Sequence, residues 1–204
     1  MQVEIENSQY LERQRKGRWI FFSMLIFFIV PIIVVIGMYK YDWHPQGASV
    51  GALVTPAHSL QMPNNLKMSD GKSLNADIWI DKWSMVYVTT TCEEKCKTKL
   101  RNMRQIHVSL YKDIPRMQRV LITSQAEVSE ILQIHPELLI VNQPADALNL
   151  LSEQFNEPNI QAISADKLYL VDPRGFLMMR YDAAVDPALI RKDIVRLMKY
   201  SWAG

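Results

Sequence analysis

The hydrophobic pattern begins with one long apolar run and continues with a series of short amphipathic segments. Residues 19–39 form a stretch of 21 residues without a charge. At about 1.5 Å of rise per residue, a helix of this length crosses a hydrocarbon core of about 30 Å. Pro31 lies inside the run, and membrane helices tolerate proline. The pattern therefore predicts a transmembrane helix over 19–39.

Charges on either side of this run predict its orientation. Four basic residues lie between positions 13 and 18, whereas only Lys40 follows the run closely. The positive-inside rule then places residues 1–18 in the cytoplasm as a short tail. The run is too long for the core of a cleaved signal peptide, and three glutamates among the first twelve residues disfavour a transit peptide. We expect a single-pass protein of a bacterial inner membrane with a periplasmic C-terminal domain.

The next segment, 40–62, contains Pro45, Gly47, Gly51 and Pro56 among small and polar residues, which is typical of a linker. From residue 63 onward, β-rich runs alternate with helical patterns. The first predicted elements are a hairpin over 65–74, a strand over 83–89 and a helix to about 111. A strand over 120–123, a helix capped by Ser124 and Glu127, and a strand over 138–141 follow. The last elements are a helix after Pro144, a hairpin over 167–181 and a helix after Asp186. This order favours an α/β domain over 63–204, with a mixed central sheet and helices on both faces.

The two cysteines of the chain stand four residues apart, directly after the predicted strand 83–89. Cys92 falls where the next helix begins, and Cys96 falls on its buried stripe. The helix dipole and free N–H groups at such a position stabilise a thiolate. A strand that leads into two thiols at a helix N-terminus is the thioredoxin arrangement. Cys92 is expected to be the more acidic and exposed thiol, and Cys96 the resolving one.

Composition narrows the possible functions. The formal charge is +2, and no block of lysine and arginine suggests binding to nucleic acid.

Two alternatives for the cysteine pair remain: an inert structural disulfide, and the active site of a general periplasmic thiol–disulfide oxidoreductase. The latter usually has a shorter C-x-x-C spacing and a proline before the late strand, whereas no proline stands between Pro158 and Pro173. A peroxiredoxin is disfavoured because its Pro-x-x-x-Thr-x-x segment does not precede Cys92.

Four stretches together resemble the Sco/SenC family, thioredoxin-like factors that help assemble the CuA copper centre of cytochrome c oxidase. The resemblance covers roughly residues 60–200 and rests on four motifs in the same order. The stretches are Asp70-Gly71-Lys72 in the early hairpin, Thr91-Cys92-Glu93-Glu94-Lys95-Cys96 as the C-x-x-x-C motif, His135-Pro136-Glu137-Leu138-Leu139 before a strand, and Tyr169-Leu170-Val171-Asp172-Pro173-Arg174-Gly175 in the late turn.

The resemblance implies that Cys92 and Cys96 are both the redox-active thiols and the ligands of a copper ion. In the family, a histidine just before the late hairpin completes the copper site, but here that stretch, 162–166, reads Ala-Ile-Ser-Ala-Asp. His107 is expected about 16 Å along its helix from Cys96. His135 ends another helix, and His58 lies in the predicted linker. Two thiolates alone suit Cu(I) better than Cu(II), so loss of the histidine disfavours Cu(II) most.

The implied function is that of a membrane-anchored Sco-like factor in assembly of cytochrome c oxidase. It acts through the dithiol as a thiol–disulfide reductant, as a Cu(I) carrier, or as both. The implied partner is the oxidase subunit that carries CuA or another copper chaperone. A non-catalytic scaffold of oxidase assembly, with Cys92 and Cys96 as a structural disulfide, stays open as an alternative, so enzymatic activity is not decided at this point.

Overall fold

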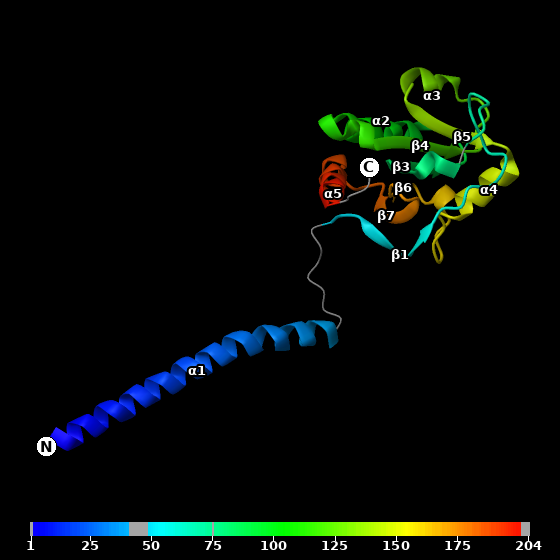
Figure 1. Ribbon diagram of the computed structural model, residues 1–204. Coiled ribbons are helices and arrows are strands. Elements are labelled where there is room, and N and C mark those ends of the chain that lie inside the picture. The colour runs from blue at the N-terminus through cyan, green and yellow to red at the C-terminus, as the bar shows by residue number, and fades with distance from the viewer. Residues whose placement is uncertain (1, 41–48, 75, 201–204) are drawn as a thin grey trace. The chain divides into compact units, whose positions relative to one another are not determined.

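The computed structural model describes residues 2–40, 49–74 and 76–200. The chain divides into two compact units, with the boundary between Ala48 and Ser49. Helix α1 (Gln2–Lys40) makes up the described part of the first unit (Figure 1). Within it, Gly17–Met38 is apolar and long enough to cross a membrane, with a mean hydropathy of 3.0. The predicted membrane helix is thus the C-terminal half of a longer helix.

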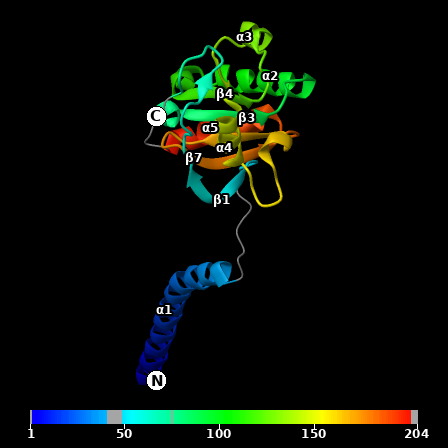
Figure 2. The same cartoon turned by 90° about the vertical axis from the view of Figure 1, so that its right-hand side faces the viewer.

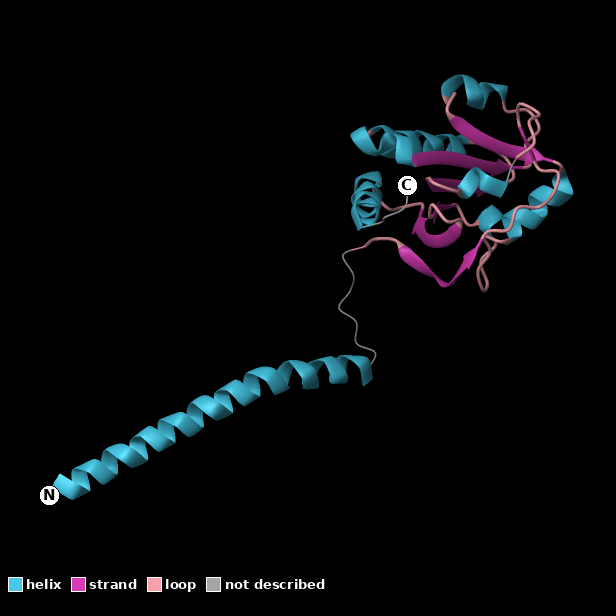
Figure 3. Cartoon of the chain, in the orientation of Figure 1, coloured by secondary structure: helices cyan, strands magenta, loops and turns pink. Residues whose placement is uncertain are grey.

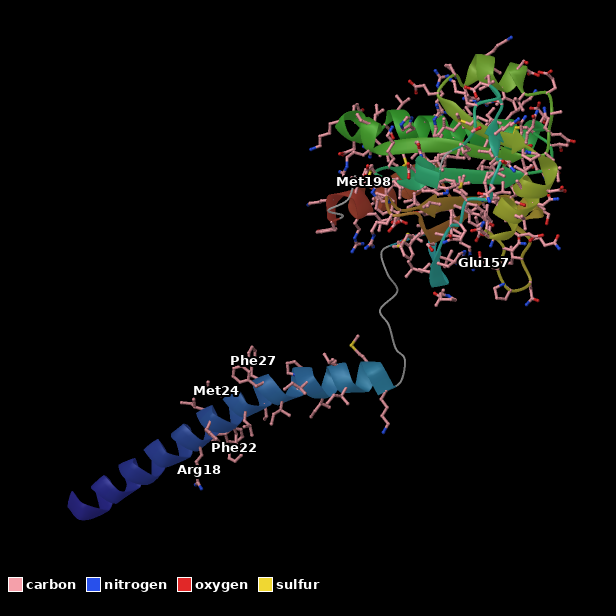
Figure 4. The ribbon with its side chains drawn as sticks, turned by 45° about the vertical axis from the view of Figure 1, so that its right-hand side comes forward. Arg18, Phe22, Met24, Phe27, Glu157 and Met198 are labelled. Atoms are coloured by element: carbon pink, nitrogen blue, oxygen red, sulfur yellow. A yellow bond between two sulfur atoms is a disulfide. The ribbon has the colours of Figure 1, made fainter. Side chains whose placement is uncertain are left out.

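Apolar side chains surround this part of α1 on all sides. Phe22, Met24 and Phe27 project from the helix in different directions (Figure 4), and their exposed fractions are 55%, 61% and 74%. A helix that is apolar all round and buries none of these side chains in protein matches a lipid environment. These features support a membrane anchor.

The second unit is built on a seven-stranded mixed sheet (Figure 3). The strand order is β1-β7-β6-β3-β4-β5-β2, and β1 lies at one edge (Figure 2). Strands β3, β4 and β5 pair in parallel, and the remaining neighbours pair antiparallel. The bounds are β1 Ala52–Ser59, β2 Lys67–Met68, β3 Trp83–Thr89, β4 Met117–Thr123, β5 Leu138–Gln143, β6 Lys167–Val171 and β7 Phe176–Asp182.

Helices cover both faces of this sheet, which confirms the predicted α/β class. Side chains of β3 alternate between the faces: Met85 and Tyr87 join one buried cluster, and Val86 and Val88 join the other. The first cluster packs under α2 and α5, and the second under α4, which lies across the strands from α5 in Figure 1. The helices are α2 Glu94–Val108, α3 Ser129–Ile134, α4 Ala145–Glu153 and α5 Pro187–Tyr200, with 3-10 turns at Ala76–Trp79, Tyr111–Arg116 and Ala162–Ser164.

Part of the segment expected as a linker folds into the sheet. Strand β1 pairs antiparallel with β7 and buries Val54. Just before it, Asp193 of α5 accepts hydrogen bonds from the Ser49 hydroxyl at 2.7 Å and the Val50 N–H at 2.8 Å. Gly51 and Pro56 give this segment the composition of a linker. An edge strand with mostly exposed side chains also has little hydrophobic alternation, so the pattern did not predict a strand here.

One local prediction around a turn differs from the structure, and another is confirmed. The capping box of Ser124 and Glu127 is wrong: α3 begins at Ser129, whose N–H donates to the Glu127 side chain at 2.9 Å. The early hairpin forms as predicted, with Gly71 at φ +79° and a hydrogen bond of 2.8 Å from the Leu74 N–H to the Leu66 carbonyl. Its short strand β2 also pairs with β5.

Candidate functional site: a disulfide beside an open cavity

The cysteine pair lies at the junction between β3 and α2. Strand β3 ends at Thr89 and α2 begins at Glu94, so Cys92 is in the connecting loop and Cys96 is in the first helical turn. Their sulfur atoms form a disulfide, and their Cα atoms are 4.9 Å apart. Both side chains are buried, with exposed fractions of 6% for Cys92 and 2% for Cys96. Cys92 is therefore only slightly more exposed than its partner.

A hydrogen-bond network from β4 and β5 holds the loop that carries Cys92. The Cys92 N–H donates to the side-chain oxygen of Gln125 at 2.7 Å. The Thr123 hydroxyl, at the end of β4, donates to the Thr90 carbonyl at 3.0 Å and accepts from the Gln125 N–H at 3.2 Å. Asn142 of β5 is buried and donates to the Gln125 carbonyl at 3.2 Å. Two parallel strands thus fix the position of the first cysteine.

An open cavity of about 500 Å³ lies against the disulfide, and Cys96 is among the residues that line it. Ser164 and Asp166 come from the segment before β6, and Tyr87 and Thr89 come from β3. Ser164 stands in the stretch where the resemblance expects a histidine. The structure therefore brings that stretch to the cysteine pair, with a hydroxyl in place of an imidazole.

Two polar side chains at or near this cavity, Tyr87 and Lys99, have hydrogen-bond partners. The Tyr87 hydroxyl donates to the Asp166 carboxylate at 2.8 Å. Burial of the phenol, followed by this bond, raises the pKa of Tyr87, so the phenol stays protonated. Lys99 is buried nearby on α2 and donates to the Ala183 carbonyl at 3.2 Å. Burial lowers the pKa of Lys99, and the negative charge of Asp166 opposes that change.

Histidines do not complete a metal site at the cysteines within the described residues. His107 is buried and contacts the Ile114 and Met117 carbonyls through Nε2, at 3.2 and 3.0 Å. The Nε2 atom of His58 contacts the Gln154 carbonyl at 2.7 Å. His135 lies at the end of α3, and none of these three lines the cavity at Cys96. His44 of the predicted linker lies outside the described residues.

The ligand atoms at the site fit copper only in part. Among the residues described, no group of three or more His, Cys, Asp or Glu side chains is arranged to hold a metal ion. Methionines such as Met85 and Met103 are fully buried in the core and offer no third sulfur to the cavity. After reduction of the disulfide, two adjacent thiolates would be present, which is a ligand set for Cu(I) and a poor one for Cu(II).

The sequence identified the two cysteines but not the residues that support them. Gln125 lies in the predicted start of a helix and Tyr87 in the predicted strand over 83–89, and neither pattern assigns these residues to the site. A signal for Tyr87 was available, because a tyrosine hydroxyl in a core strand requires a polar partner. No sequence signal pairs it with Asp166, since the two residues are 79 positions apart.

Comparisons with known proteins agree with this geometry. A family model described as transmembrane-like, thioredoxin-like, C-terminal domain matches residues 83–201. Three similar solved structures are yeast Sco1 with copper bound, Arabidopsis thaliana ScoI with copper bound, and BsSco, a member of the Sco family of cytochrome c oxidase assembly proteins in which a disulfide switch was identified.

These structures align over most of their length. Yeast Sco1 is 21% identical, with 71% of this chain and 95% of that chain covered and a TM-score of 0.60. The Arabidopsis protein is 15% identical, with 75% of this chain and 100% of that chain covered and a TM-score of 0.57. BsSco is 16% identical, with 72% of this chain and 95% of that chain covered and a TM-score of 0.52. No curated protein matches the sequence.

The family match covers more than half of the chain, and the structural matches confirm the Sco-like fold expected from the four motifs. Strands β3 to β7, the cysteine loop and the late hairpin lie within the matched residues, whereas β1 and β2 precede them. The chain therefore belongs to the family of transmembrane-like, thioredoxin-like C-terminal domains, and it has the fold of the Sco proteins.

Proposed function

We propose that this protein is a membrane-anchored, Sco-like thiol–disulfide factor that serves assembly of the CuA centre of cytochrome c oxidase. The observation that carries the proposal is the Cys92–Cys96 disulfide at the start of α2, beside an open cavity. A pair that closes a disulfide within one helical turn can also be reduced and pass two electrons to a partner. The reductant role comes first because no histidine among the described residues lines the cavity at Cys96.

The proposed reaction is an exchange between the dithiol and a disulfide of the target. The Cys92 thiolate attacks one sulfur of the target disulfide, and the other target sulfur leaves as a thiolate. Cys96 then loses its proton and attacks the Cys92 sulfur, which releases the second target thiolate. The Cys92–Cys96 pair is oxidised by two electrons and the target is reduced by two. Cys92 is assigned the first attack because it precedes the helix and is the more exposed of the two.

Copper enters this proposal as cargo. Once reduced, Cys92 and Cys96 would hold Cu(I) through two soft thiolates, and the ion would pass to the partner. Ser164 and Asp166 offer only hard oxygen atoms to the cavity. Such atoms suit Cu(I) poorly, so the site would release its ion more readily than a site with an additional imidazole. The partner is the subunit that carries CuA, or a second copper chaperone.

Location follows the same proposal. The four basic residues before the apolar helix keep the N-terminus in the cytoplasm, and the thiol domain works in the periplasm. An oxidising compartment explains how a disulfide persists there. The target of such a reductant would itself be a periplasmic disulfide, which the cytoplasmic thiol pool cannot reach.

A thiol-transfer assay tests the proposal. The full-length chain in detergent is reduced, freed of reductant and mixed with an oxidised CuA-bearing subunit, and thiols on both proteins are counted by alkylation and mass spectrometry. We expect about one target disulfide reduced per domain oxidised. Cys92→Ser/Cys96→Ser is the control. Transfer no faster than that of this control would reject the reductant role. A separate titration of the same two proteins with Cu(I), against a competing chelator, tests the carrier role.

A further inference from the structure

A second cavity of about 310 Å³ lies between α2 and α3. It shares no lining residue with the cavity at the disulfide. Leu100 and Ile131 supply buried apolar surface, and Ile134, half exposed, extends that surface toward solvent. The volume is at the lower end of the range for small-molecule pockets, which is about 300–1,000 Å³. The pocket therefore has an apolar interior with room for a small organic group.

One side of this cavity is a row of cations on α2. Lys97, Arg101 and Arg104 are spaced by four and three residues, so they share a helix face. Lys97 is paired with Glu130 at 3.0 Å, and Arg104 donates to the Ile134 carbonyl at 3.5 Å. Like charges at this spacing repel each other. Glu130 is the one acidic residue in the lining, and it neutralises only part of the positive charge of this row.

Two buried side chains have polar atoms without hydrogen-bond partners. His135 lines the cavity with only 5% of its surface exposed, and its Nδ1 atom has no hydrogen-bond partner among the described residues. Arg119 of β4 is 2% exposed, and its Nε and one Nη lack partners in the same part of the chain. Its other Nη is 3.8 Å from Glu137, which is too long for a hydrogen bond.

The positive charges act together on His135. Burial first, and then the charges of Arg119, Arg104 and Arg101, lower the pKa of its imidazole. Arg101 and Arg104 line the cavity themselves, whereas Arg119 is not among its lining residues. The cations of the row on α2 repel each other, and an anion bound between Arg101 and Arg104 would reduce that repulsion.

We propose that the cavity between α2 and α3 binds a small organic anion, in which one carboxylate is attached to a compact apolar body. The apolar body packs on Leu100, Ile131 and Ile134, as the buried surface requires. The carboxylate accepts charge-assisted hydrogen bonds from Arg101 and Arg104, whose planar guanidinium groups match a carboxylate. The site is distinct from the disulfide cavity, because the two cavities share no lining residue.

Fluorine NMR on the full-length chain in phosphatidylcholine nanodiscs tests this proposal. The probe is 4-(trifluoromethyl)benzoate, the uncharged analogue 4-(trifluoromethyl)benzyl alcohol is the matched ligand, and empty nanodiscs correct for partition into lipid. A charged hydrogen bond contributes about 1.5–3 kcal/mol, so we expect the acid to bind at least about tenfold more tightly than the alcohol. Equal affinities for the two probes would overturn the proposal.

Variants then locate the binding. Arg101→Gln/Arg104→Gln removes two exposed charges and should abolish the preference for the acid. Lys192→Gln/Arg196→Gln removes two exposed charges from α5 and should leave that preference intact. Thermal unfolding of both variants checks that they are folded. An unchanged preference in the first variant contradicts the assigned site. Full displacement of the benzoate by equimolar inorganic phosphate contradicts the assigned ligand class, because charge alone would then suffice.

Discussion

The side-chain oxygen of Gln125 accepts a 2.7 Å hydrogen bond from the backbone N–H of Cys92. The same glutamine donates from Nε2 to the Glu127 carbonyl at 2.6 Å. One side chain therefore connects the loop after β4 to the loop that carries the first cysteine. Cys92 is 94% buried in the disulfide form, so opening of this connection would expose its sulfur to a reductant.

Replacement of Gln125 by alanine should speed reduction of the disulfide. A net hydrogen bond contributes about 1 kcal/mol, so loop opening should become about fivefold more frequent. The rate of reduction by dithiothreitol, followed by alkylation and mass spectrometry, measures the effect. Gln133→Ala, an exposed glutamine on α3, is the matched control. A rate in Gln125→Ala no higher than in this control contradicts the prediction.

Replacement of Ser164 by histidine should create a copper site with a third ligand. Ser164 and Cys96 line the same cavity, and an imidazole nitrogen is the ligand that Cu(II) requires beside thiolates. We expect the reduced Ser164→His protein to bind Cu(II) at least about tenfold more tightly than the wild type. A competition titration with visible absorption measures this. Ser129→His, on exposed α3, should give no such gain.

Acidification should destabilise the domain through His135. Its pKa is lowered from the ordinary value of 6.5, mainly by burial, so the unfolded chain binds the proton more readily than the folded one. The free energy of unfolding should therefore fall as pH drops below about 6.5, by at most about 1.4 kcal/mol per pH unit from this group. The fall should stop once pH is below the pKa of the folded state.

Urea unfolding of the full-length chain in detergent, followed by tryptophan fluorescence at pH 7.5 and 5.5, measures this dependence. The His135→Gln variant has no imidazole at this position, so its free energy of unfolding should change less between the two pH values. Other titratable groups contribute equally to both proteins. Parallel pH dependences in wild type and variant would show that His135 is not the group responsible.

Reduction of the disulfide should cost the domain only modest stability. The Cys92–Cys96 link closes a loop with a sequence separation of 4. In the chain-entropy model such a short loop contributes about 2 kcal/mol, less than the longer loops of stapled domains. Unfolding with and without tris(2-carboxyethyl)phosphine measures the difference, and Cys92→Ser/Cys96→Ser should not respond to the reagent. A loss above about 5 kcal/mol would indicate a structural disulfide and weaken the redox proposal.

The sequence predicted most of the scaffold because its strong signals are local. Strand β3, helix α2 and the late hairpin each have a clear alternation or a turn sequence, and each forms where it was expected. Strand β1 was missed because an edge strand with mostly exposed residues has no alternation of its own. The start of α3 was misplaced because Gln125 binds Cys92 and Glu127, which extends the loop after β4 beyond Ser124.

The cysteine pair was likewise visible in the sequence, whereas its surroundings were not. Tyr87 and Asp166, and Cys92 and Gln125, are joined by contacts 79 and 33 positions apart in the chain. Only the order of strands in the sheet brings these residues together, since β3 lies between β6 and β4. The resemblance did place the segment around Ser164 near the thiols, and the cavity confirms that proximity.

In the proposed exchange, Cys92 attacks a target disulfide and Cys96 resolves the product. The most direct test is a trapping experiment with the full-length Cys96→Ser variant and an oxidised CuA-bearing subunit, analysed by non-reducing electrophoresis and mass spectrometry. We expect a mixed disulfide through Cys92 that accumulates in Cys96→Ser and not in Cys92→Ser. Absence of a mixed disulfide in Cys96→Ser would show that Cys92 does not make the first attack.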